Sequence, residues 1–174
     1  RSKEVMEIFL DRFAGLEPDL LCPEISVFNT LDLHGLWTSI AELPGRDVEL
    51  PEIPYWGIVW PGARALARFI LDNPHLVRGK RVLDLACGSG LIALAAAHAG
   101  AVVTGIDLDA DAIRIARHTA RTNRLSCQWR TADIFSLSEE EFLQFDLVLT
   151  AEVFHTEKLA AQSMALLRRL PRGL

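Results

Sequence analysis

Residues 81–109 read RVLDLACGSGLIALAAAHAGAVVTGIDLD and contain the pattern that decides the fold. The apolar run over 81–86 predicts a buried strand, and the glycines after it predict a sharp turn. An alanine-rich run over 91–99 then predicts a buried helix, and a second apolar run over 101–107 predicts another strand. This order favours two parallel strands that are joined by a helix.

The same alternation of helices and strands continues on both sides of this stretch. Helices are expected over 61–72, 110–123 and 156–170, a helix or turn over 139–142, and further strands over 126–131 and 145–150. We therefore expect an α/β fold of the Rossmann-like, doubly wound type. Its sheet should be mainly parallel, with helices on both faces.

The first sixty residues carry weaker signals. An amphipathic helix over 2–14 is expected from its apolar face, Val5, Met6, Phe9, Leu10 and Phe13. Prolines interrupt 15–54, so irregular structure is expected there, with short strands only at 25–28 and 47–50. We therefore divide the chain into an N-terminal helical and irregular extension, 1–60, and a main domain, 61–174.

The composition limits the partners and the compartment. Half of the 174 residues are hydrophobic, which allows one domain with a sizeable core. Lys and Arg number 18 against 23 Asp and Glu, a net charge of −5, so no nucleic-acid partner is expected. No apolar stretch is long enough to span a membrane. The three cysteines have no ligand spacing, which favours reduced thiols, no metal site and a cytoplasmic protein, or a mitochondrial matrix protein in a eukaryote.

The glycine turn predicts a nucleotide-like ligand. Residues 88–93 read GSGLIA and match the pattern G-x-G-x-x-[G/A], in which glycines let a ligand approach the backbone closely. Asp107 ends the second strand, 19 positions after Gly88, where an acid can bind the hydroxyls of a ribose. We therefore expect a cofactor that carries adenosine. The alternative is a tight turn with a capping aspartate.

Asp84, at the edge of this turn, discriminates between adenosine cofactors. A dinucleotide places its pyrophosphate at the helix N-terminus, and a carboxylate beside it would repel the phosphates. S-adenosylmethionine carries an ammonium and a sulfonium instead, so a carboxylate favours it. We expect Asp84 near the amino-acid end of that cofactor, directly or through water. An additional role is to pin the glycine turn through backbone N–H groups.

Three motifs resemble those of the class I, seven-strand S-adenosylmethionine-dependent methyltransferases, over about 53–154. VLDLACGSG resembles their first motif, with Ala86 in place of a common glycine, and GIDLD resembles the second. TADIF, residues 131–135, resembles the third, which implies that Asp133 meets the adenine amino group and that Ile134 packs on the ring. The resemblance also implies the cofactor-binding residues Gly88, Ser89, Gly90 and Asp107.

A closer resemblance extends upstream of the first motif. PYWGIVWPGARALARFILDNPHLVRGKRVLDL, residues 54–85, is similar to the seven-strand protein-lysine methyltransferases, above all the group that modifies the electron-transfer flavoprotein beta subunit. In related proteins the second tryptophan of the aromatic segment lies beside the cofactor, which implies this role for Trp60. For Trp56, cofactor contact and closure of the core stay equally open.

The same family has an acid-x-x-aromatic motif after the fourth strand, usually Asp-x-x-Tyr. Here it reads EVFH, residues 152–155. The resemblance implies that Ala151 faces the cofactor through its backbone and that Glu152 aligns the acceptor amine. His155 replaces the usual tyrosine, and its imidazole is a candidate proton acceptor. The alternative for His155 is a histidine that bonds only to backbone.

The resemblance implies a protein-lysine N-methyltransferase with a protein substrate. Two alternatives stay open: a methyltransferase for a small molecule or another protein side chain, and a truncated, non-catalytic domain that binds a partner. The family fold has seven strands, and this chain stops where a fifth is expected, so its C-terminal strands are expected to be missing. The apolar strand at 145–150 would then be an edge that a dimer mate or another partner covers.

Overall fold

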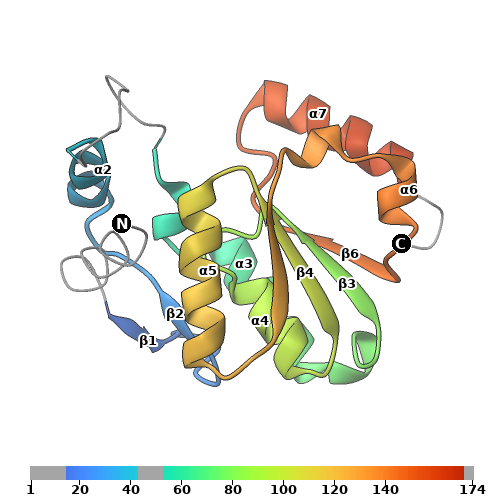
Figure 1. Ribbon diagram of the computed structural model, residues 1–174, viewed down its shortest axis with the longest axis horizontal. Helices are drawn as coiled ribbons and strands as arrows, with labels where there is room; N and C mark the ends of the chain where they lie inside the picture. Colours follow the sequence, from blue (N-terminus) through green and yellow to red (C-terminus); the bar gives the residue numbers. More distant parts are fainter. Residues whose placement is uncertain (1–14, 43–52, 171–174) are drawn as a thin grey trace.

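The computed structural model describes residues 15–42 and 53–170 (Figure 1). The helix expected over 2–14 and the strand expected over 47–50 lie outside the described residues. The central sheet has the strand order β5-β4-β3-β6, and each neighbouring pair is parallel. The Rossmann-like α/β class expected from the sequence is thereby confirmed. The four strands are β3 (Arg81–Leu85), β4 (Val102–Asp107), β5 (Cys127–Thr131) and β6 (Leu147–Thr150).

The strand order reverses at β3. The chain adds β4 and then β5 on one side of β3, and returns to place β6 on the other side. In parallel sheets a ligand crevice forms at such a reversal, outside the carboxyl ends of the strands. Among the described strands, β6 pairs only with β3, so it forms an edge of the sheet in this part of the chain.

Helices cover both faces of the sheet, because side chains alternate along each strand. Val82 and Val103 belong to a cluster with α3 (Pro61–Asp72) and α4 (Leu91–His98). Leu83, Leu85 and Ile106 belong to another cluster on the opposite face, which also holds residues of two later helices. The remaining helices of this domain are α5 (Ala110–Thr122), α6 (Glu139–Phe142) and α7 (Glu157–Arg169), with single turns η2 (Pro74–Leu76) and η3 (Ile134–Ser136).

The N-terminal segment is more regular than expected. Strands β1 (Leu16–Pro18) and β2 (Ser26–Phe28) form an antiparallel hairpin, and β2 confirms the strand expected near 25–28. Helix α2 (Leu33–Ala41) follows, so the expectation of irregular structure there was wrong. The helix forms because the Asp32 side chain caps it, accepting a hydrogen bond from the Gly35 N–H at 2.8 Å.

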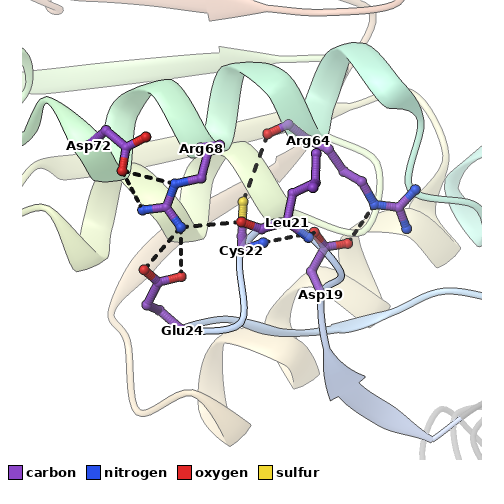
Figure 2. A network of polar contacts seen from close by, with 7 residues as sticks. All are labelled: Asp19, Leu21, Cys22, Glu24, Arg64, Arg68 and Asp72. Carbon is purple, nitrogen blue, oxygen red and sulfur yellow. Dashed lines mark hydrogen bonds and ion pairs between the residues drawn. The ribbon is translucent and has the colours of Figure 1, made fainter.

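A polar network fastens this hairpin to α3 (Figure 2). The Asp19 carboxylate is buried and accepts a hydrogen bond from Arg64 Nε at 2.7 Å. One helical turn later, Arg68 bonds to the Leu21 carbonyl at 3.2 Å and to the Glu24 carboxylate at 3.0 Å. Two arginines of α3 therefore hold the loop that connects β1 to β2.

The hairpin and the main domain also share one hydrophobic cluster. Cys22, Ile25 and Val27 are buried in the same cluster as the apolar residues of α3 and α4. The division of the chain at residue 60 stays a prediction. All three cysteines are free, and in the described residues no helix combines the length and the apolar character that a membrane crossing needs.

Candidate functional site

A cavity of about 560 Å³ lies at the carboxyl ends of the strands. Its wall combines the turn after β3, the loops after β4, β5 and β6, and an aromatic segment around η1 (Tyr55–Gly57). This is the crevice that the strand order favours. Most of the residues predicted from the sequence line it: Trp60, Gly88, Ser89, Asp107, Asp133, Ile134, Ala151, Glu152 and His155.

Gly90 is one of two predicted residues that do not line the cavity. Its φ is 95°, in the left-handed region, and a Cβ on it would lie 2.9 Å from Cη2 of Trp129. A Cβ on Gly105 of β4 would meet the same indole, at 2.5 Å from Cζ3. Gly90 therefore makes room for Trp129 of β5, whereas Gly88 lines the cavity itself.

Asp84 is the second predicted residue outside the cavity wall, and it is fully buried. Its Oδ2 accepts a hydrogen bond from the Ala93 N–H at 3.0 Å, so it ties β3 to the first turn of α4 and not to the glycine turn itself. Its Oδ1 is buried and has no hydrogen-bond partner among the described residues. Burial above all, and also the charge of Asp107, raises the pKa of Asp84 to about 8.

Asp107 connects the glycine turn to the loop after β4. Its Oδ2 accepts a hydrogen bond from Gly88 N at 2.8 Å, and its Oδ1 accepts one from Asp109 N at 2.9 Å. Burial raises the pKa of this carboxyl above its usual range, while these backbone bonds lower it. A carboxylate oxygen accepts more than one hydrogen bond, so Asp107 retains acceptor capacity for ribose hydroxyls.

The loops after β4 and β5 supply apolar surface for a flat ring. Ile134 is buried at the start of η3, where the Asp133 side chain accepts a hydrogen bond from Phe135 N at 2.9 Å. Leu108 also lines the cavity and is 64% exposed, unusual for a leucine at a strand end. Sequence reasoning missed Leu108, although its position between two acids in GIDLD was a signal.

Trp56 links the aromatic segment to the loop after β4. Its Nε1 donates to Asp109 Oδ2 at 2.6 Å, and its ring lies 6.0 Å from that of Phe28. Trp56 is buried and also lines the cavity. Closure of the core and contact with the cavity were alternatives in the sequence, and this side chain does both.

Glu152 and His155 line the cavity, and His155 neighbours the aromatic segment there. The Tyr55 ring centroid is 6.2 Å from that of Trp60 and 5.7 Å from that of His155. His155 Nδ1 is 2.9 Å from the backbone oxygen of Glu152. A carbonyl oxygen only accepts, so Nδ1 is the donor in this contact, and in a neutral imidazole Nε2 then keeps its lone pair. His155 therefore bonds to backbone and can still accept a proton.

Metal ligands and a reactive thiol are two further kinds of group that this cavity could offer. Among residues 15–42 and 53–170, no three His, Cys, Asp or Glu side chains are grouped to hold a metal ion. Cys87 lines the cavity, but burial raises the pKa of its thiol well above the usual range. A thiol that stays protonated is a poor nucleophile, which fits the absence of any role assigned to Cys87 from the sequence.

The family model described as "Methyltransferase domain" matches residues 82–173. The chain belongs to this methyltransferase domain family. S-adenosylmethionine is the cofactor of the family, and it carries an activated methyl group. The cavity of this methyltransferase domain fits that cofactor, because Asp107 lines it and retains acceptor capacity for ribose hydroxyls, and Ile134 offers apolar surface beside it.

Two relatives resemble this methyltransferase domain in sequence. An electron transfer flavoprotein beta subunit lysine methyltransferase of Danio rerio is 34% identical over 159 residues, 90% of this chain and 58% of the relative. A ubiquinone biosynthesis O-methyltransferase of Actinobacillus pleuropneumoniae is 42% identical over 86 residues, 49% of this chain and 35% of the relative. This chain therefore spans less than two thirds of either relative.

A solved structure supports the cofactor. The 16S rRNA methyltransferase of T. thermophilus, in complex with AdoMet and guanosine, matches with a TM-score of 0.54 and 27% identity. The match covers 70% of this chain and 35% of that one.

Proposed function

We propose that this chain carries the cofactor pocket and the acceptor end of a protein-lysine N-methyltransferase. One observation carries the proposal: Glu152 lines the cavity together with Tyr55, Trp60 and His155, and the Tyr55 ring neighbours both of the other rings. A carboxylate attracts an ammonium group, and the faces of aromatic rings attract cations. Such an end suits a lysine side chain better than a hydroxyl or a carboxylate acceptor.

The extent of the similarities supports the same choice. The lysine methyltransferase from Danio rerio aligns with 90% of this chain, whereas the O-methyltransferase aligns with 49%. An electron transfer flavoprotein beta subunit, named as the target of the first relative, is therefore the first acceptor to test.

The residues at the acceptor end can orient an amine and take its proton. Lysine has a reference pKa of about 10.4, so its amine must lose a proton before the nitrogen attacks the methyl carbon in line with the departing thioether. A nearby carboxylate favours the charged amine, so Glu152 docks and aligns the acceptor and is not a strong base. His155 Nε2 is the candidate that accepts the proton.

A labelled methyl-transfer assay tests the proposal. The chain is incubated with S-adenosylmethionine carrying a labelled methyl group and an electron transfer flavoprotein beta subunit, and the modified residue is located by mass spectrometry. We expect label on lysine. We expect Glu152→Gln to reduce the rate roughly 10- to 100-fold with cofactor affinity unchanged, because an aligning group is lost.

Glu157→Gln is the matched control, since Glu157 is an exposed glutamate that does not line the cavity. Its rate should stay within about twofold of the wild type. The similarity to an O-methyltransferase favours a small-molecule acceptor as the second candidate function. Label in a small phenolic acceptor, with none in lysine, would establish the second candidate and reject the first.

A further inference from the structure

Glu152 has a backbone conformation that few residues other than glycine adopt. Its φ is 60°, two residues after the end of β6. Such strain persists only where neighbouring contacts hold it. Two contacts do so here: Oε1 accepts a hydrogen bond from Gly62 N at 2.8 Å, and the backbone oxygen lies 2.9 Å from His155 Nδ1.

The first turn of α3 receives this carboxylate because residue 62 has no side chain. Trp60 is the N-cap and Pro61, which has no N–H, is the first helical residue, so Gly62 offers the first unpaired N–H of the helix. The positive end of the helix dipole also favours a carboxylate there. A Cβ on Gly62 would lie 2.5 Å from Oε1 and 3.2 Å from Cδ of Glu152.

We propose that Gly62 is a positioning residue for methyl transfer, because its missing side chain lets Glu152 bind the first turn of α3 at the acceptor end of the cavity. This inference rests on the proposed function and deepens it. Oε1 is fixed by Gly62, whereas Oε2 accepts no hydrogen bond from any described residue, so it is available to an acceptor amine. Gly62 acts through Glu152 and touches neither acceptor nor cofactor chemistry itself.

The geometry predicts that Gly62→Ala changes activity much more than stability. The steric conflict falls on the far end of a flexible side chain, which can swing away at low cost. The φ of Gly62 lies outside the left-handed region, and alanine is a better helix former than glycine. The displaced carboxylate, however, no longer stands where the acceptor amine arrives.

The test compares variants in the methyl-transfer assay, in calorimetric titrations with S-adenosylmethionine and in thermal unfolding. For Gly62→Ala we expect kcat to fall roughly tenfold, with the Kd of the cofactor within about twofold. We expect Tm to stay within about 4 °C of the wild type. Gly35→Ala is a close structural match, since a Cβ on Gly35 in α2 would likewise meet a carboxylate, that of the N-cap Asp32. It should leave kcat within about twofold.

A shorter acid at position 152 should compensate for the effect of Gly62→Ala on kcat. In the wild-type chain, Glu152→Asp should reduce kcat several-fold because the carboxylate no longer reaches Gly62 N. In the Gly62→Ala chain the same change should be neutral or favourable, since the shorter side chain clears the new Cβ. Any one of four results would overturn the inference. For Gly62→Ala these are an unchanged kcat, a loss of cofactor affinity as large as the loss of kcat, and a Tm loss above about 10 °C. The fourth is an equal effect of Glu152→Asp in both chains.

Failure of the proposed function gives a different result. The wild-type chain would then bind the cofactor and label a small molecule but no lysine. The same variants would be compared on that acceptor, where unchanged rates in Gly62→Ala would overturn the positioning role as well.

Discussion

Asp84 lies in the middle of β3, where strand alternation turns its side chain toward α4. Its burial removes the water that would stabilise a negative charge, and its Oδ1 has no partner among the described residues. The pKa of about 8 follows mainly from this burial. The protonation of this one residue therefore contributes to the stability of the domain.

Asp84 predicts a pH dependence of stability for the chain without cofactor. Its pKa is about 3.8 in the unfolded chain and about 8 in the folded one, so the folded state binds the extra proton between these values. The free energy of unfolding should therefore fall as pH rises from about 5 to 8, by up to about 1.4 kcal/mol per pH unit from this group. Denaturant titrations over this range measure the slope.

Asp84→Asn should flatten this slope, because the amide does not titrate and its oxygen can still accept from Ala93 N. In this variant the free energy of unfolding should still fall slightly as pH rises, because burial also raises the pKa of Asp107. Glu140→Gln, which removes an exposed carboxylate, is the control for the loss of one acidic side chain. A slope in Asp84→Asn equal to that of the wild type would show that Asp84 is ionised in the folded chain.

The sequence identifies residues that belong to a local motif better than residues whose role depends on a partner far away in the chain. Asp107 ends β4, Asp133 and Glu152 follow β5 and β6 by two residues, and all three belong to recognisable patterns and line the cavity. Gly62 and Tyr55 were not singled out, because their importance comes from partners 90 and 100 positions away in the chain. Periodicity and local motifs carry no information on such pairs.

At the scale of elements, two helices end in the same motif with different residues. After α4, Gly100 has a φ of 95°, and Ala101 N bonds to Ala96 O at 2.9 Å. After α5, Arg124 has a φ of 57°, and Leu125 N bonds to Ala120 O at 2.9 Å. Both are Schellman endings, in which glycine is the favoured residue.

Arg124→Gly should stabilise the domain by about 1 kcal/mol, because glycine takes the left-handed conformation without a steric penalty. Thermal unfolding should show a Tm about 2–4 °C higher. The reciprocal change, Gly100→Ala, should lower Tm, since its Cβ would also lie 3.3 Å from Arg78 Cγ. A lower Tm for Arg124→Gly would mean that the arginine side chain stabilises the helix end more than the strained φ costs.

Helix α2 was not predicted from the sequence, because the signals in its segment conflict. Prolines on both sides of it favoured irregular structure. The decisive signals were short ones: Asp32 as the cap, with Leu36 and Ile40 buried on one face. Ile40 also lines the cavity, so the N-terminal segment contributes to the site.

At the scale of the whole molecule, the alternating strands and helices of the main domain followed from their apolar periodicity, which is clearest in β3, a strand that is buried on both faces. The docking of the N-terminal hairpin onto α3 could not be predicted from periodicity, because it depends on charged pairs such as Asp19 with Arg64. α3 receives this hairpin along its length and Glu152 at its first turn. The helix therefore connects the N-terminal segment to the acceptor end of the site.

A calorimetric titration of the whole chain with S-adenosylmethionine tests the central claim most directly. We expect one site with a Kd in the micromolar range, about −8 kcal/mol, and at least tenfold weaker binding for Asp107→Ala, because that carboxylate is placed for the ribose. NADH should give no heat of binding. Tight binding of NADH, with no binding of S-adenosylmethionine at millimolar concentration, would contradict the account.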